Sequence, residues 1–287
     1  MKHLLTINDL TEEELLEIID KAIDMKEEPE KYFDILKNKT LAMLFQKTST
    51  RTRMSFEAGM SQLSGHAIYM DWGTTNLTLG ALQDETKCMA RYVDIILARV
   101  FSHKDIETIA KASAVPVING LSDSFHPCQA IADLLTIKEK LGKLKGVKLA
   151  YVGDGNNVCN SLILACTKTG IDITVVTPKG YEPKIKKGVK LMNDPKGAVK
   201  NADVVYTDTW VSMGQEKERE EKVKDFKGFQ VDKKLLGKAL FMHCLPAHRG
   251  YEVSDDVMDS KQSVVFDQAE NRMHAQKAVM LKLMGKI

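Results

Sequence analysis

Apolar residues recur every three or four positions in several segments of the chain, and short continuous apolar runs separate these segments. Residues 9–25 are the first periodic segment and predict an amphipathic helix, with Thr11 and Glu14 as a capping box at its start. Four apolar runs of strand length follow, at 40–45, 66–70, 94–100 and 115–118. Helix-like stretches lie between them, at 53–64, 84–92 and 104–113. The first half is therefore predicted to alternate strands with helices.

A second series of the same kind fills the rest of the chain. Strands are predicted at 147–152, 172–177, 203–207, 240–244 and 263–266. Helices are predicted at 157–169, 195–201, 215–225, 232–238 and 268–284. Strands that alternate with helices form parallel sheets that are covered on both faces. The sequence thus predicts an α/β protein of two domains, each a mostly parallel sheet flanked by helices.

A long helical segment at 127–141 is predicted to bridge the two series. We expect a first domain at residues 1–130, with the C-terminal helix 268–287 packing back on it. The second domain is expected at residues 131–267. A length of 287 residues is enough for two ordinary domains of this kind.

Composition narrows the class of partner. The net charge is only +2, with 41 basic and 39 acidic residues, so neither a nucleic acid nor a membrane surface is expected as the main partner. No apolar run approaches membrane-spanning length, and the N-terminal residues resemble neither a signal peptide nor a transit peptide. The five cysteines form no C-x-x-C pair. These features predict a cytoplasmic protein with reduced thiols and no disulfide framework.

Residues 49–53, Ser-Thr-Arg-Thr-Arg, lie between a predicted strand and a predicted helix. A helix start presents unpaired N–H groups and a positive dipole end, and arginine grips oxygen pairs bidentately. Ser49, Thr50, Arg51, Thr52 and Arg53 are therefore candidates to hold a tetrahedral oxyanion. Taken alone, such a string is more often a helix cap with two surface arginines.

Ligands of open α/β sheets bind beyond the carboxyl ends of the strands, so residues at the other strand ends of the first half matter as well. Arg99 closes the run 94–99 and is either a snorkelling surface residue or a third ligand for the anion. His126 and Gln129 open the bridging helix three residues apart, where both can hydrogen-bond one carbonyl group. A lone histidine before proline is usually a turn residue, and Gln129 changes that interpretation.

Strand ends of the second half carry different chemistry. Residues 153–157, Gly-Asp-Gly-Asn-Asn, have Val158 where a dinucleotide fingerprint needs its third glycine, so nicotinamide binding is not expected. Asp208 follows one strand, and Cys244 follows another beside His243. Cys244 is either a small apolar plug or a contact for a substrate amine, because adjacent strand residues face opposite ways and His243 is badly placed as its base. No metal-ligand spacing is present, so neither a metal nor a cofactor is expected.

Together these segments resemble the aspartate/ornithine transcarbamylase family, and most closely its ornithine branch. The resemblance rests on residues 49–53, 98–99, 126–129, 153–157, 208–214, 243–246 and 270–272, in the family's order over nearly the whole chain. Ser-Met-Gly at 212–214 and His-Cys-Leu-Pro at 243–246 are the segments that favour the ornithine branch. The resemblance implies an anabolic-type enzyme of arginine biosynthesis that transfers the carbamoyl group of carbamoyl phosphate to the side-chain amine of L-ornithine, giving L-citrulline and phosphate.

The resemblance also implies residue roles and an assembly. Carbamoyl phosphate would be held by Ser49, Thr50, Arg51, Thr52, Arg53, Arg99, His126, Gln129, Cys244, Leu245 and Arg272. Ornithine would be bound by Asn157, Asp208, Ser212 and Met213. The residues closest to the chemistry would be Arg51, Arg99, His126, Asp208 and Cys244. The family is typically built on homotrimers and needs no metal.

One segment departs from the family pattern. A loop from a neighbouring subunit usually reaches the phosphate site, and here the matching residues 78–84 are about three residues shorter, with Thr78 where the family has glutamine. Gln83 is a candidate substitute. This departure leaves a non-catalytic binding module on the same fold as one alternative. A transcarbamylase for another amine, such as putrescine, is a second alternative of the same enzyme class. We also predict a hinged lid at residues 215–224, which follow Gly214.

Overall fold

The computed structural model describes residues 2–211 and 219–287, and the chain divides into two compact units. The first unit comprises residues 1–135 and 270–287, and the second comprises residues 136–269. Both boundaries fall inside long helices, α5 (Pro127–Leu141) and α11 (Val265–Leu283), so each of these helices contributes to both units. Each unit contains one sheet with parallel strands and flanking helices, which confirms the predicted fold class.

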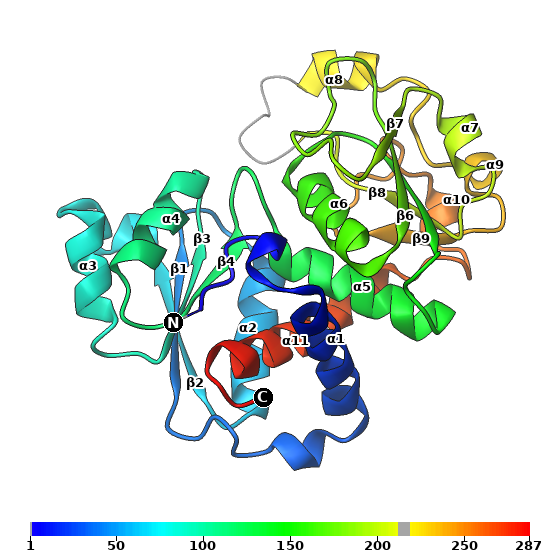
Figure 1. The fold of residues 1–287 in the computed structure, drawn as a ribbon. Helices are drawn as coiled ribbons and strands as arrows, with labels where there is room; N and C mark the ends of the chain where they lie inside the picture. The colour runs from blue at the N-terminus through cyan, green and yellow to red at the C-terminus, as the bar shows by residue number, and fades with distance from the viewer. Residues whose placement is uncertain (1, 212–218) are drawn as a thin grey trace. The chain divides into compact units, whose positions relative to one another are not determined.

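The sheet of the first unit has four strands in the order β2-β1-β3-β4. These strands are β1 (Thr40–Phe45), β2 (His66–Asp71), β3 (Ile95–Arg99) and β4 (Val117–Leu121). Helices α3 (Leu82–Met89) and α4 (His103–Ala112) cover one face, while α1 (Glu12–Glu27), α2 (Thr50–Gln62) and α11 cover the other (Figure 1). Because β1 and β3 are buried on both faces, they read as continuous apolar runs rather than as alternating patterns.

Helix starts in the first unit follow the capping signals in the sequence. The Thr11 hydroxyl accepts from the Glu14 N–H, and the Glu14 carboxylate accepts from the Thr11 N–H, which confirms the predicted capping box of α1. The Ser49 hydroxyl accepts from the Thr52 N–H and so caps α2. Four short 3₁₀ turns complete this unit, at Ile7–Asp9, Pro29–Tyr32, Trp72–Thr74 and Asn76–Thr78.

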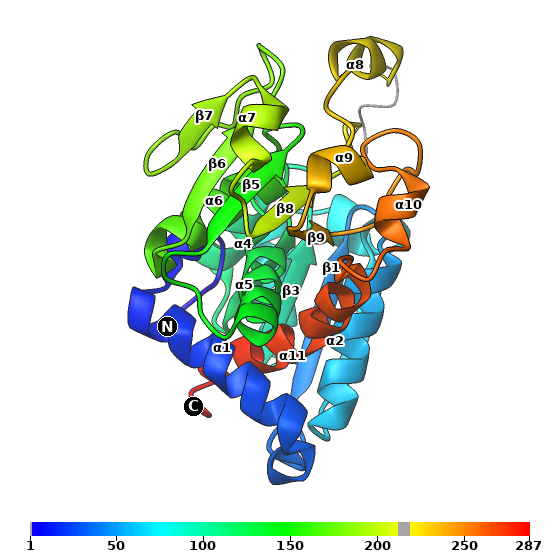
Figure 2. The same ribbon diagram turned by 90° about the vertical axis from the view of Figure 1, so that its right-hand side faces the viewer.

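The sheet of the second unit has five strands in the order β7-β6-β5-β8-β9. They are β5 (Lys148–Val152), β6 (Asp172–Val176), β7 (Lys190–Met192), β8 (Val204–Thr207) and β9 (Leu240–His243). Helix α6 (Asn157–Thr169) covers one face, and the short helices α7 (Pro195–Val199), α9 (Lys233–Leu236) and α10 (Asp255–Met258) lie over the other (Figure 2). Helix α8 (Arg219–Asp225) adds Phe226, at its C-terminal end, to the apolar core on that side.

Three elements of this unit differ from the predictions. The predicted strand at 263–266 is wrong, because Ser263 makes a single bridge to Phe241 and α11 already begins at Val265. The β-branched run suggested a strand, but the same residues belong to a longer helical repeat that buries Val265, Gln268 and Arg272 on one side. Strand β7 and helix α10 were not predicted, since three or four residues carry too little periodic signal.

Candidate functional site

The first unit gathers polar side chains at the carboxyl ends of β1, β3 and β4. These ends lie at one edge of the sheet because the strands are parallel. Ser49 begins the loop-to-helix turn after β1, and its hydroxyl donates to the Thr52 hydroxyl at 3.1 Å. The N-terminus of the 13-residue helix α2 therefore stands at the strand ends with its dipole pointing toward them.

Arg272 from α11 joins this group through a buried hydrogen-bond chain. Its Nη2 donates to the Thr52 hydroxyl at 3.0 Å, and its Nη1 donates to the Gln129 side-chain oxygen at 3.0 Å. The Gln129 amide nitrogen donates in turn to Asp133, 2.8 Å away. Both polar atoms of Gln129 thus contact protein groups, and its predicted contact with a substrate carbonyl stays a prediction.

His126 lies in the same group and is almost completely buried. Burial holds the pKa of its imidazole well below the usual value of 6.5, and neighbouring positive charges lower it further. These charges belong to Arg272, Arg99, Lys47 and Arg51. A neutral imidazole is a hydrogen-bond donor that keeps its proton at neutral pH, which suits the polarisation of a carbonyl oxygen.

Lys47 is a cation of this group that the sequence motifs did not single out. Burial lowers the pKa of its ammonium group to about 8, and the charge of Arg99 contributes to this shift. Its ammonium also lies over the Phe101 ring, 4.9 Å from the centroid. Its position between β1 and the Ser49 turn was visible in the sequence, but its burial was not.

Arg53, another predicted anion ligand, contacts two neighbouring side chains of the first unit. Its Nε donates to Glu57 at 2.9 Å, and its guanidinium lies over the Tyr69 ring at 4.0 Å from the centroid. The side chain is about half exposed. Glu57 and Tyr69 therefore hold the Arg53 side chain in this orientation.

The second unit gathers its polar groups around Asp208, at the carboxyl end of β8. The Asp208 carboxylate is buried and accepts from the Cys244 thiol at 3.0 Å and from the Asn156 amide at 2.7 Å. Asn156 also caps α6, accepting from the N–H groups of Val158 and Cys159. Three strand-end segments, after β5, β8 and β9, therefore meet at one carboxylate.

His243 and Cys244 have different hydrogen-bond partners. The imidazole Nε2 of His243 lies 3.2 Å from the buried Glu252 carboxylate, and its Nδ1 accepts from the Leu245 N–H at 2.8 Å. This pattern assigns the proton to Nε2. Because His243 is engaged by Glu252 and Leu245, it does not form a cysteine–histidine dyad with Cys244.

One group of described residues has the donor types and spacing for a metal ion. One ligand atom each of Asp208, His243 and Cys244 lies within 4.8 Å of the others. All three side chains already make the hydrogen bonds described above, which an ion would have to displace. These contacts favour a polar substrate-binding group over a metal centre.

The predicted site residues thus divide between the two units. The first unit holds Ser49, Thr50, Arg51, Thr52, Arg53, Arg99, His126, Gln129 and Arg272. The second holds Asn157, Asp208, Cys244 and Leu245. The two remaining predicted ligands, Ser212 and Met213, lie outside the described residues, as does most of the first half of the predicted lid. Leu245, with a φ of 59°, follows Cys244 in the left-handed backbone region, which is uncommon for leucine.

Comparison with known families matches nearly the whole chain. Residues 2–139 match the carbamoyl-P binding domain of aspartate/ornithine carbamoyltransferases. Residues 145–283 match the Asp/Orn binding domain of the same family. The first match contains Arg51, Arg99 and His126, and the second contains Asp208, Cys244 and Arg272.

Individual relatives are similar over their full length. An ornithine carbamoyltransferase of Pyrococcus horikoshii is 53% identical, with 100% of this chain and 96% of the relative covered. An anabolic ornithine carbamoyltransferase of Pyrococcus furiosus is also 53% identical, with 100% and 97% covered. A solved structure of the P. furiosus ornithine carbamoyltransferase superposes with a TM-score of 0.94, covering 100% of this chain and 98% of that one.

Proposed function

Because this chain belongs to the aspartate/ornithine carbamoyltransferase family, we propose that it transfers the carbamoyl group of carbamoyl phosphate to the side-chain amine of L-ornithine, giving L-citrulline and phosphate. The observation that carries this function is identity of 53% to ornithine carbamoyltransferases over the full chain. This similarity favours neither a putrescine enzyme nor a non-catalytic module.

The first unit is proposed to bind carbamoyl phosphate. Its phosphate would accept hydrogen bonds from the α2 N-terminus and from Arg51, with Arg99 as a further cation. Cations here also stabilise the charge that grows on the phosphate as it leaves. Neutral His126 would donate to the carbamoyl oxygen, where negative charge develops in the tetrahedral intermediate. Arg272, fixed between Thr52 and Gln129, supplies positive charge at the same group.

The second unit is proposed to bind ornithine. The side-chain ammonium of ornithine must lose a proton before its nitrogen lone pair can attack the carbamoyl carbon. A new C–N bond then forms, and the bond from carbon to the phosphate oxygen breaks. The Cys244 thiol and the Asp208 carboxylate are suited to contact this amine, because they are hydrogen-bonded to each other at 3.0 Å. Asn157, Ser212 and Met213 are proposed to bind the amino-acid end.

The assembly and setting of the enzyme follow from the family in this proposal. We expect a homotrimer, or a multiple of one, acting in the cytoplasm in arginine biosynthesis. No helix among the described residues has the length and apolar character to cross a bilayer.

A colorimetric citrulline assay with ornithine, and in parallel with putrescine, tests the proposed function. We expect product from ornithine alone. Arg51→Ala should lower turnover by about 10²–10³-fold, because it removes a donor to the developing charge, while circular dichroism shows an unchanged fold. Near-normal turnover of this variant would refute the phosphate assignment.

Cys244→Ala tests the second group separately. We expect it to lower turnover and raise the KM for ornithine, with little change in the KM for carbamoyl phosphate, since the thiol hydrogen-bonds to Asp208 in the second unit. Steady-state kinetics with each substrate varied in turn will measure both constants. Equal losses for both substrates would contradict a specific role of Cys244 in ornithine use.

A further inference from the structure

The turn before His126 is held by its own backbone and by one buried hydroxyl. It joins β4 to α5, and the Ser122 N–H donates to the Phe125 carbonyl at 2.9 Å. The Phe125 N–H donates back to the Ser122 hydroxyl at 3.2 Å. His126 is the next residue, so this turn leads directly into the backbone that carries its imidazole.

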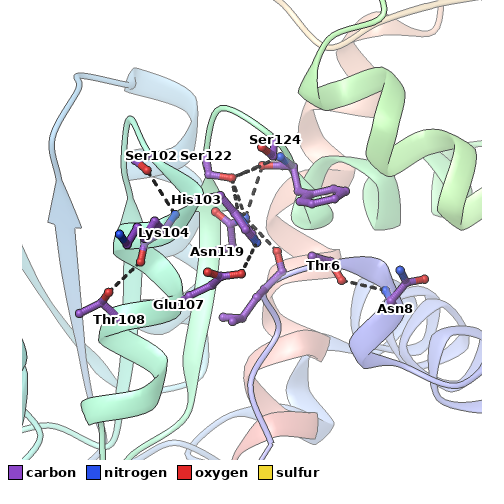
Figure 3. Close-up of polar contacts among 12 residues, drawn as sticks. Thr6, Asn8, Ser102, His103, Lys104, Glu107, Thr108, Asn119, Ser122 and Ser124 are labelled. Atoms are coloured by element: carbon purple, nitrogen blue, oxygen red, sulfur yellow. Dashed lines mark hydrogen bonds and ion pairs between the residues drawn. The ribbon is translucent and has the colours of Figure 1, made fainter. Parts of the chain in front are cut away.

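His103, the first residue of α4, also contacts this turn. Its Nδ1 lies 2.8 Å from the Ser122 hydroxyl, and its backbone N–H donates to Asp123 at 2.9 Å. Its ring packs edge-on against Phe125, with centroids 5.1 Å apart. Figure 3 shows the His103 side chain pointing from α4 toward Ser122 and Asn119. One residue therefore contacts three of the four turn residues.

Ser122, His103 and Glu107 together have the composition of a hydrolytic triad. The Glu107 carboxylate lies 4.0 Å from His103 Nε2, which is longer than a hydrogen bond. The Ser122 side chain is completely buried and also accepts from the Asn119 amide at 3.4 Å. A nucleophile must be reachable by its substrate, so this arrangement does not support hydrolysis and instead fixes the turn.

The first turn of α4 also connects to the loop after β1. The Gln46 amide nitrogen donates to Asp105 at 3.0 Å, and its oxygen accepts from the Phe101 N–H at 2.6 Å. The segments after β1, β3 and β4 therefore meet at the start of α4. Arg51, Arg99 and His126, which the proposed function assigns to carbamoyl phosphate, lie in or next to these segments.

We infer that His103 is a positioning residue for carbamoyl phosphate: its bond to Ser122 fixes the 122–125 turn and thereby the His126 imidazole. The inference rests on the proposed function of the first unit. His103 would act on His126 through Ser122, Asp123 and Phe125, which makes it a positioning residue rather than a catalytic one. A misplacement of about 1 Å at a polarising group can lower the rate by up to about a hundredfold, so a fixed turn before His126 favours catalysis.

Four variants of the full-length protein test this inference. His103→Ala removes the bond to Ser122, and Ser122→Ala removes it from the other side. His103→Asn keeps a polar atom near the Nδ1 position and should restore the bond. Thr108→Ala is the matched control, because it deletes a hydroxyl bond to the Lys104 carbonyl within α4 without touching the turn.

We expect His103→Ala and Ser122→Ala each to lower kcat/KM for carbamoyl phosphate by about tenfold, with the KM for ornithine changed less than twofold. The double variant should be no worse than either single one, as coupled partners require. His103→Asn should recover most of the loss, and Thr108→Ala should match the wild type. Thermal unfolding of each variant will separate kinetic loss from loss of folded protein.

Two results would overturn the inference. One is a His103→Ala enzyme as active as Thr108→Ala. The other is an equal loss for both substrates that His103→Asn does not rescue. A wild-type protein that makes no citrulline would instead refute the proposed function, and the inference with it. The two failures are therefore distinguishable in a single set of assays.

Discussion

Lys47 carries a positive charge that depends on pH near neutrality. The other cations of the proposed carbamoyl phosphate site are arginines, whose charge does not change in this range. Burial lowers the pKa of its ammonium to about 8. The ammonium is charged below that pH and loses its proton above it, so the group has one positive charge fewer at pH 9.5 than at pH 7. A dianionic ligand should bind more weakly as that charge is lost.

We therefore predict that the KM for carbamoyl phosphate rises by about three- to tenfold between pH 7 and pH 9.5, at saturating ornithine. Lys47→Met should have the higher KM at both pH values and lose this pH dependence. Lys47→Arg should keep the lower KM at both, because guanidinium stays protonated. Lys47 does not contribute to anion binding if the wild-type KM for carbamoyl phosphate is unchanged between pH 7 and pH 9.5. The same conclusion follows if Lys47→Met shows the same pH dependence of KM as the wild type.

At the residue scale, motif reasoning found the groups that face a ligand better than the groups that orient them. Ser49 and Arg272 both hydrogen-bond to Thr52. The sequence indicated all three residues, through a helix cap and a family motif. Asp133 and His103 were not found, since each orients another residue and carries no motif of its own. Their roles depend on burial and on partners distant in the sequence, which only tertiary structure provides.

Helix α8 is held to the second unit by a buried ion pair and an aromatic contact. Lys222 is almost fully buried, and its ammonium lies 2.7 Å from the Asp154 carboxylate. Phe226, just after the helix, stacks on Trp210 with ring centroids 5.3 Å apart. Tyr181 donates to Asp225 at 2.7 Å, and this bond is the main cause that raises the pKa of the Tyr181 hydroxyl to about 12.

Lys222→Met should destabilise the second unit by about 3–5 kcal/mol, because it leaves the Asp154 carboxylate buried without its cation. Adding Asp154→Asn should recover much of this loss, since the remaining group is neutral. Lys224→Met, an exposed lysine of the same helix, is the control and should change stability by less than about 0.5 kcal/mol. Urea unfolding measures the free energy of unfolding of the wild type and the three variants. Equal effects of Lys222→Met and Lys224→Met on this free energy would contradict the ion-pair argument.

The sequence predicted helices and strands correctly where a periodic segment was long, and wrongly where it was only a few residues long. Helix α6, at Asn157–Thr169, has the bounds that the sequence predicted, because its apolar face, its Asn156 cap and Gly170 at its end all agree. The run at 263–266 was assigned as a strand because four residues cannot distinguish a strand from the first turn of a helix. The residues that distinguish a helix from a strand here are the later residues of α11, which lie beyond this run.

At the scale of the whole molecule, this chain is a shortened version of its relatives. Its alignment with the P. horikoshii enzyme spans 307 residues, although this chain has only 287, so the relative contains segments that are missing here. The sequence predicts that residues 78–84 are one of the shortened segments. Leu79 is 80% exposed, and Gln83 stands exposed in the first turn of α3. An exposed leucine and an exposed amide within one short segment are suited to contact another subunit.

If residues 78–84 complete the phosphate site of a neighbouring subunit in the proposed trimer, each site takes residues from two chains. Light scattering should then give about three times the 32.1 kDa chain mass, or a multiple of that. Gln83→Ala should be nearly inactive, like Arg51→Ala. When these two inactive variants are mixed in equal amounts, unfolded and refolded together, about a quarter of the sites should combine an intact Arg51 with an intact Gln83 from the neighbour.

Recovery of about a quarter of wild-type activity in the mixture, with none from either variant refolded alone, would establish sharing of the site. A mixture of Arg51→Ala with Arg99→Ala is the control, because the first unit of one chain holds both residues, and it should stay inactive. A fully active Gln83→Ala would instead mean that the shortened segment has lost the role its longer counterpart has in the family. The arginines, the α2 N-terminus and Lys47 of one chain would then have to hold the phosphate without a neighbour.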